Sequence, residues 1–175
     1  YGGNNNDDIS DFEGTNLIHG DAGADVLAGS GEIYGGFGND SVNVVGTGYG
    51  DGGNDSVTGT GEMHGGDGDD SVSGTGVLYG DAGNDALVPY GSSTAYGGAG
   101  NDSFAQNIYH EGDATYYGGA GNDSISIIYG GDTAFGDDGD DVISAGIYSG
   151  DNALSGGAGE DLITGGTGND TIDGG

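Results

Sequence analysis

The chain has 175 residues, among them 46 Gly, 30 Asp or Glu and no Lys, Arg or Cys, which gives a formal net charge of −30. Without cationic side chains it cannot neutralise phosphate, so nucleic acids and acidic membrane surfaces are excluded as electrostatic partners. Without Cys it has neither disulfides nor thiolate metal sites, and no apolar run approaches the roughly 20 residues of a membrane-spanning helix. A charge this large with 32% hydrophobic residues is typical of disorder, but the even spacing of the aliphatic residues favours a fold that depends on a cation.

A nine-residue phrase begins near the N-terminus and recurs along the whole chain. The copy at 118–126 reads GGAGNDSIS, and successive copies up to residue 156 are 15 to 21 residues apart. The eleven copies begin at Gly2, Gly20, Gly35, Gly50, Gly65, Gly80, Gly97, Gly118, Gly136, Gly156 and Gly165. Repetition at such a period indicates a solenoid.

The first six positions of each copy predict a tight turn. Glycines at the first, second and fourth positions permit backbone conformations with positive φ. The fifth position is usually Asn or Asp, the residues other than glycine that best tolerate the left-handed region. The sixth position is Asp in all eleven copies.

The last three positions predict a short strand. The eighth position is apolar in every copy, and its neighbours are mostly small and polar, so one side chain points inward and two point outward. The predicted inward residues are Ile9, Leu27, Val42, Val57, Val72, Leu87, Phe104, Ile125, Ile143, Ile163 and Ile172.

Shorter phrases between the copies, such as GTGEMH at 59–64, predict a second turn and a second short strand. Ile33, Met63 and Leu78 are the expected inward residues of these strands. The sequence therefore predicts an all-β fold, a flattened right-handed parallel β-roll of nine or ten coils with about 15–21 residues per coil and strands about 4.8 Å apart. Helix is excluded because each interior glycine costs about 1 kcal/mol.

We expect one β-roll domain over residues 1–175. The chain starts at Tyr1 without Met, and a twelfth copy is cut off after Gly174 and Gly175. Both observations predict a fragment or module of a longer repeat array.

Stacked coils would bring the Asp side chains of the sixth position close together. Two carboxylates about 5 Å apart repel by roughly 3 kcal/mol at an effective dielectric constant near 20. Carboxylates and turn carbonyls are the ligands that Ca²⁺ prefers, whereas Mg²⁺ demands a tighter octahedron. Ten stacked turns leave nine gaps, so about nine or more Ca²⁺ are expected in a ladder along one edge.

The phrase resembles the RTX ("repeats in toxin") nonapeptide G-G-x-G-x-D-x-U-x, and residues 118–126 fit it at every position. The resemblance covers essentially the whole chain. It implies calcium-triggered folding after type I export from a Gram-negative bacterium, and hence a secreted or cell-surface location. It also implies a C-terminal export signal, which these residues do not contain.

The resemblance implies a set of calcium ligands. The carboxylates would be Asp7, Asp25, Asp40, Asp55, Asp70, Asp85, Asp102, Asp123, Asp141, Asp161 and Asp170. Backbone carbonyls would come from the glycine turns, including Gly35, Gly36, Gly38, Gly65, Gly66, Gly68, Gly97, Gly98, Gly100, Gly118, Gly119, Gly121, Gly156, Gly157 and Gly159.

Several residues depart from the family pattern. Most second turns are short, so one main ladder is expected, while the copy at Gly165 follows Gly156 by nine residues and should lie on the opposite edge. Asn5 replaces the fourth-position glycine of the first copy, where a weaker site is expected. Asp replaces the second glycine in four copies, at Asp21, Asp51, Asp81 and Asp137, either as added ligands or as surface charge. Extra ions at Asp113, Asp132 or Asp151 of the second edge stay open.

Two outward rows accompany the repeat. An aromatic residue usually precedes the glycine pair, which predicts a column on one face: Tyr1, His19, Tyr34, Tyr49, His64, Tyr79, Tyr96, Tyr117 and Phe135. This column is either ordinary cross-strand stacking or a contact surface for carbohydrate, neighbouring modules or self-association. The other face carries rows of Ser, Thr and Asn, which are either solvated or a surface for ice or glycans.

Catalysis is not expected in this segment, because the acidic residues repeat in every turn and do not converge on one cleft. The predicted function is an extracellular, calcium-dependently folding structural module, such as an adhesin stalk, a surface-layer block or a filament block. The alternatives are the accessory roll of a secreted enzyme or toxin, and an ice- or carbohydrate-binding roll.

Overall fold

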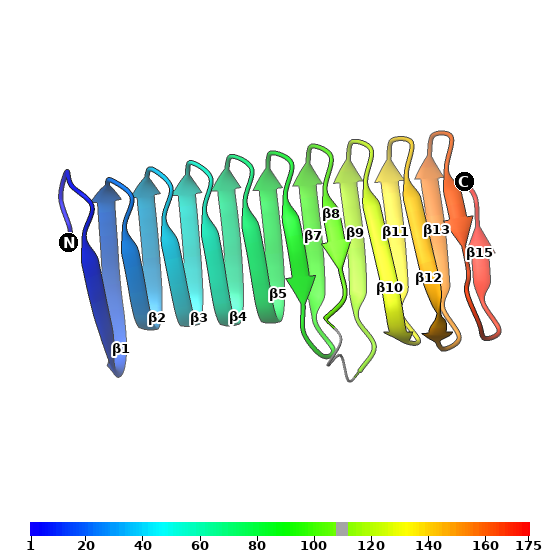
Figure 1. Cartoon of the computed structure of the whole chain (residues 1–175), viewed down its shortest axis with the longest axis horizontal. Helices are drawn as coiled ribbons and strands as arrows, with labels where there is room; N and C mark the ends of the chain where they lie inside the picture. The colour runs from blue at the N-terminus through cyan, green and yellow to red at the C-terminus, as the bar shows by residue number, and fades with distance from the viewer. Residues whose placement is uncertain (108–111) are drawn as a thin grey trace.

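The computed structural model describes residues 1–107 and 112–175 as one flattened solenoid of about eleven turns (Figure 1). The described residues form strands and turns without a helix, so they contain no helix that could span a membrane. Every recorded strand pair is parallel. The predicted all-β parallel solenoid is therefore confirmed, with about eleven turns where nine or ten coils were expected.

The strands follow the repeat in chain order. Those of the N-terminal half are β1 (Asp8–Ala22), β2 (Val26–Phe37), β3 (Ser41–Gly52), β4 (Ser56–Asp67), β5 (Ser71–Ala82), β6 (Ala86–Pro89) and β7 (Thr94–Ala99). Those of the C-terminal half are β8 (Ser103–Ala105), β9 (Thr115–Ala120), β10 (Ser124–Gly130), β11 (Thr133–Asp138), β12 (Val142–Ser149), β13 (Ala153–Ala158), β14 (Leu162–Thr164) and β15 (Thr171–Asp173).

The solenoid has two edges. We call the edge formed by the nonapeptide turns from Gly2 to Gly156 the first edge, which is uppermost in Figure 1, and the opposite one the second edge. In Figure 1 each coil runs down one face, crosses the second edge and returns up the other face. Gly175 lies against the Gly157 carbonyl, so the chain reaches the first edge again at its end.

The 15-residue coils differ in one respect from the prediction of two short strands each. Strands β2 to β5 are continuous over 12 residues, including the second turn. Their registers match across that turn, for example at Gly46↔Gly61. Coils of equal length let the turn backbones pair as well, so the ladder is not interrupted. Beyond β5, longer second turns separate the two strands of each coil.

The core is a single layer of side chains between the two faces. Eight of the predicted inward residues are fully buried: Leu27, Val42, Val57, Val72, Leu87, Phe104, Ile125 and Ile143. Ile33, Met63 and Leu78 of the return strands are fully buried as predicted. Ile9 and Ile163 pack against the core while partly exposed. Ile172 pairs with the buried Leu154 and so shares its inward register, but it is 51% exposed because β15 is the last strand of the sheet and is covered on one side only.

Candidate metal centre

The Asp residues of the sixth position form a continuous ladder on the first edge. The backbone N–H of each Asp donates to Oδ1 of the Asp in the next coil, over nine consecutive bonds of 2.7–2.9 Å. The ladder comprises Asp7, Asp25, Asp40, Asp55, Asp70, Asp85, Asp102, Asp123, Asp141 and Asp161. The predicted stacking of these ten residues is confirmed.

The second carboxylate oxygen of every ladder Asp is buried and has no hydrogen-bond donor among residues 1–107 and 112–175. This holds for Oδ2 of all ten residues, including the terminal Asp7 and Asp161. A buried acceptor without a partner costs about 1–3 kcal/mol, and more when it is charged. These ten oxygens form one row, and they are therefore the main set of buried acceptors in the described structure that lack a compensating donor or cation.

These oxygens face other acceptors. A methyl group on Gly35 would lie 2.5 Å from both Asp40 Oδ2 and the Gly50 carbonyl oxygen of the next coil. The same pairing of carboxylate and carbonyl recurs beside the first-position glycines along the ladder up to Gly136, as at Gly97, where Asp102 Oδ2 faces the Gly118 carbonyl. Both acceptors thus border the same small space beside the glycine, and a buried carboxylate in such a place is stabilised by a bound cation or by protonation.

The electrostatic cost appears in the pKa values of the ladder. Burial, helped by the charge of neighbouring ladder residues, raises the pKa of Asp55 to about 6 and the pKa values of Asp85 and Asp123 to about 7. The hydrogen bond that each accepts from a backbone N–H opposes the rise. Burial also raises the pKa values of Asp40, Asp70, Asp102 and Asp141.

The donor set fits calcium. All the atoms that face each other are oxygens, from one carboxylate and one backbone carbonyl at each step, and Ca²⁺ accepts 6–8 such ligands in adaptable geometry. Within residues 1–107 and 112–175, no three His, Asp or Glu side chains gather into a metal-binding group. An ion on this edge would thus take many of its ligands from backbone carbonyls.

The predicted carbonyl ligands fall into two groups. First-position carbonyls, such as those of Gly35, Gly65 and Gly97, lie beside the Oδ2 atom of the preceding coil. Carbonyls of later glycines instead lie against the same position of the next coil, as the Gly98 carbonyl does at Gly119 and the Gly100 carbonyl at Gly121. The structure therefore brings the first group nearest to the unpartnered carboxylate oxygens.

Asp170 lies apart from the other ten residues. Its Oδ1 accepts the backbone N–H of Asn152, and Thr171 pairs with Ala153. This places the copy at Gly165 on the second edge, as its nine-residue spacing from Gly156 predicted.

The fifth position plays a part that sequence reasoning missed. Its residues do not adopt positive φ where the structure describes them, so the predicted left-handed conformation is wrong. Instead their side chains form an exposed ladder, in which the Oδ1 atoms of Asn39, Asn84 and Asn101 accept the backbone N–H of the next coil at 2.7–3.0 Å. The recurrence of Asn and Asp at the fifth position is the sequence signal that could have predicted this ladder.

The residues that replace glycine at the second and fourth positions of the repeat differ in backbone conformation. Asp21, Asp51, Asp81 and Asp137 take φ of 73–75°, and each is exposed. In the five coils from Asp21 to Asp81 they alternate with glycine at the same register, which keeps the carboxylates two coils apart. Asn5 does not take the positive φ that its glycine counterparts adopt, so the first turn differs in conformation.

The aromatic column forms as predicted. Its nine rings stack with centroids 4.4–5.1 Å apart and interplanar angles of 5–18°. All but Tyr1 are half-buried, because each ring covers the faces of its neighbours. Sugars and cations bind aromatic rings by their faces, so the column offers mainly ring edges and hydroxyl groups.

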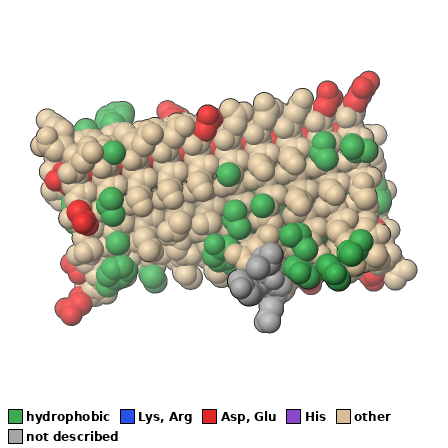
Figure 2. All heavy atoms as spheres, viewed as in Figure 1, with side chains coloured by type: hydrophobic (Ala, Val, Ile, Leu, Met, Phe, Trp, Pro, Cys, Tyr) green, Lys and Arg blue, Asp and Glu red, His purple; other side chains and the backbone are tan. Residues whose placement is uncertain are grey.

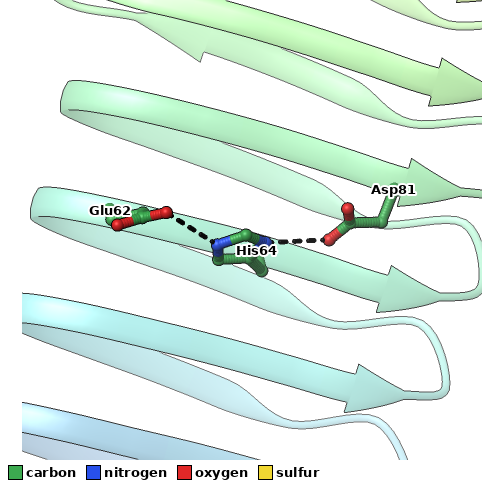
Figure 3. A network of polar contacts seen from close by, with 3 residues as sticks. All are labelled: Glu62, His64 and Asp81. Atoms are coloured by element: carbon green, nitrogen blue, oxygen red, sulfur yellow. Dashed lines mark hydrogen bonds and ion pairs between the residues drawn. The ribbon is translucent and has the colours of Figure 1, made fainter.

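One residue of this column is held by two acids. His64 of β4 lies with Nδ1 3.1 Å from Asp81 and Nε2 3.3 Å from Glu62 (Figure 3). The hydrogen bond to Asp81, with Glu62 in support, raises the pKa of His64 despite its partial burial.

Beside the column runs an open groove of about 630 Å³, lined by residues that include His19, Tyr49 and Asp51. Figure 2 shows that acidic side chains also border another face, which has no basic side chain.

Comparison with known families agrees with this architecture. The family described as RTX calcium-binding nonapeptide repeat (4 copies) matches residues 1–32, 32–43, 77–88, 90–105, 110–126, 128–147 and 148–175. No curated protein matches the chain significantly. Because the matched segments cover most of its length, the chain belongs to the RTX calcium-binding nonapeptide repeat family and is a calcium-binding β-roll module.

Proposed function

We propose that this module is an extracellular structural element whose folding is driven by calcium bound along the first edge. The observation that carries the proposal is the row of ten buried Oδ2 atoms without donors, each in a ladder Asp. The proposed ligands are these carboxylates and the first-position glycine carbonyls that face them. Ten stacked Asp residues leave nine gaps, which supports about nine ions.

Mass action supports a folding switch. A ligand that binds only the folded chain stabilises it by RT ln(1 + [L]/Kd), which is roughly 2 kcal/mol per ion for a Kd near 10⁻⁴ M at millimolar calcium. Several ions together exceed the usual net stability of about 5–15 kcal/mol for a folded domain. Millimolar calcium is found outside cells, so this dependence favours a secreted or cell-surface location, which is also typical of RTX repeats.

A structural role is favoured over a catalytic one within this module. The acidic residues recur once per coil and are partnered or stacked in the same way each time, and RTX repeats are non-catalytic. We therefore propose a stalk, surface layer or filament built from longer arrays, in which residues 1–175 form one unit. The accessory roll of a secreted enzyme or toxin is the alternative, with catalysis in another domain.

Neighbouring modules are the proposed partners of the aromatic column. Its ring faces are covered, which disfavours carbohydrate stacking, whereas ring edges and the adjoining groove stay open. The groove includes Asp21, Asp51, Asp67 and Asp81 in a chain without Lys or Arg. Contact between two copies at this surface would require bridging cations, because like charges repel.

The proposal is tested by titrating Ca²⁺ into the metal-free chain while far-UV circular dichroism and sedimentation are followed, with Mg²⁺ in parallel. A cooperative gain of β-structure at sub-millimolar to millimolar Ca²⁺, absent with Mg²⁺, is expected. Growth of the folded species with protein concentration would favour assembly over an accessory role. A metal-free chain already folded at neutral pH would contradict the calcium switch.

A further inference from the structure

The second edge carries a short ladder of its own in the C-terminal coils. The backbone N–H of Asp132 donates to Asn152 Oδ1 at 3.0 Å, and the N–H of Asn152 donates to Asp170 Oδ1 at 2.9 Å. This is the bonding pattern of the first edge, with Asn152 in the place of one ladder Asp. The two edges can therefore be compared atom by atom.

At Asn152 a donor stands where the first edge has an unpartnered acceptor. Asn152 Nδ2 donates to the Gly150 carbonyl at 2.9 Å, to Asp170 Oδ1 at 2.9 Å and to the Gly165 carbonyl at 3.3 Å. Gly165 is the first glycine of the next copy, so its carbonyl is the counterpart of those that face Oδ2 on the first edge. The side-chain amide satisfies the oxygens that would otherwise need a cation.

A second side-chain amide donates a hydrogen bond to Asp132, which is completely buried. Gln106 Nε2 donates to Asp132 Oδ2 and to the Tyr129 carbonyl, both at 2.7 Å. The backbone N–H of Ala114 donates to Asp132 Oδ1 at 2.6 Å. Both carboxylate oxygens of Asp132 thus accept hydrogen bonds, in contrast with the ladder residues of the first edge, each of which has one oxygen without a donor.

We propose that the second edge at Asp132, Asn152 and Asp170 is closed by the side-chain amides of Gln106 and Asn152 in place of calcium, and that Asn152 is the residue that keeps the ion out. The amide N–H₂ group turns its partial positive charge towards the carbonyls, so it both replaces and repels a cation at that point. The aspartates of the second edge then act as hydrogen-bond acceptors and not as calcium ligands. These residues are Asp113, Asp132, Asp151 and Asp170. The inference rests on the proposed function, because it contrasts this edge with a calcium-loaded first edge.

Two measurements test it. The first locates Tb³⁺, used as a calcium substitute, by anomalous diffraction from crystals of the whole chain. The second counts bound Ca²⁺ by calorimetric titration of the wild type, Asn152→Asp and Asn169→Asp. Asn169 lies in the adjoining turn, immediately before Asp170, but is exposed, so its variant is a control that adds an equal charge. Circular dichroism in saturating calcium verifies that each variant is folded.

Ion peaks restricted to the first edge, with one additional Ca²⁺ per chain in Asn152→Asp and none in Asn169→Asp, are the expected result. A peak between Asn152 and Asp170 in the wild type would overturn the inference and leave the proposed function intact. An unchanged calcium count in folded Asn152→Asp would also overturn it. Absence of ions from both edges would contradict the proposed function itself and remove the contrast on which the inference depends.

Discussion

A single oxygen atom per coil sets the chemistry of the first edge. Oδ1 of every ladder Asp from Asp25 to Asp161 accepts a backbone N–H, whereas Oδ2 has no donor among the described residues and, from Asp7 to Asp141, lies beside a first-position glycine. Changing the carboxylate to an amide would replace this second acceptor by a donor and keep the shape of the side chain. The calcium requirement of a coil can therefore be altered with almost no change in packing.

We predict that Asp85→Asn binds one or two fewer Ca²⁺ than the wild type, because the carboxylate borders two successive gaps. Its amide should donate to the Gly97 carbonyl, so the variant should also fold at a lower calcium concentration than the wild type. Calorimetric titration measures the count, and circular dichroism measures the calcium midpoint. The control Asp67→Asn removes the same charge from an exposed position. Equal calcium counts for Asp85→Asn and the wild type would refute the assigned role.

A methyl group on a first-position glycine should block the adjoining gap. At Gly35 it would lie 2.5 Å from Asp40 Oδ2 and from the Gly50 carbonyl, closer than real side chains approach. Gly35→Ala is therefore expected to lose calcium from this part of the ladder and to fold only at higher calcium. Gly52→Ala is the matched control, because its methyl group would be 3.8 Å from the nearest atoms. Similar calcium midpoints for both variants would show that the gap is not a site.

Within the strands, core side chains of unequal size are matched between neighbouring coils. The return strands place Leu78, Ala95, Tyr116, Ala134 and Leu154 in one register column. Tyr116 is fully buried between the two alanines and meets Phe104 edge to face, with ring centroids 6.0 Å apart. The small neighbours provide the volume that the ring occupies, so the column keeps a uniform coil spacing.

This arrangement predicts that Tyr116→Ala lowers the free energy of unfolding by about 3–5 kcal/mol, the range for removing a large aromatic side chain from a core. Tyr116→Phe keeps the ring and removes a hydroxyl that is buried without a hydrogen-bond partner among the described residues, so it should stay within about 1.5 kcal/mol of the wild type. Urea unfolding at saturating calcium measures both variants. A small effect of Tyr116→Ala would mean that the neighbouring coils collapse onto the cavity.

The strands also show which features the sequence could predict. Regular spacing of Gly, Asp and the apolar eighth position was sufficient for the parallel solenoid, the inward residues and the ten-residue ladder of the first edge. Continuous strands through the second turns were not predicted, because short Gly-rich phrases are typical of interruptions. Exact register across equal coils, as at Gly46↔Gly61, is a tertiary property that overrides this local signal.

The polar interior of the second edge was harder to predict for a different reason. Gln106 lies 26 residues from Asp132, in a segment without the repeat pattern, so no spacing rule joins their side chains. Asn152 differs from a ladder Asp by one amide group in a turn whose length is irregular. Only the register of the folded coils shows that its Nδ2 atom occupies the place of an unpartnered carboxylate oxygen.

For the molecule as a whole, protons and calcium should act as alternative means of neutralising the first edge. The folded pKa values of Asp55, Asp85 and Asp123 are about 6–7 without metal, against 3.8 for an ordinary Asp. Between these values the folded chain holds protons that the unfolded chain releases, so stability increases as pH falls. This gain is lost as pH rises through about 7 and is complete below about 3.8.

We therefore predict that the metal-free chain gains β-structure when pH is lowered from 8 to 5 in the presence of a chelator, while calcium affinity decreases because protons compete for the same oxygens. Circular dichroism against pH, with and without Ca²⁺, measures both trends; the range stops at pH 5 because the sequence pI is about 4.1. The variant with Asp55, Asp85 and Asp123 all changed to Asn should show a weaker pH dependence, since its amides do not titrate. If the metal-free wild type instead loses structure towards pH 5, the ladder carboxylates are not the groups that oppose folding.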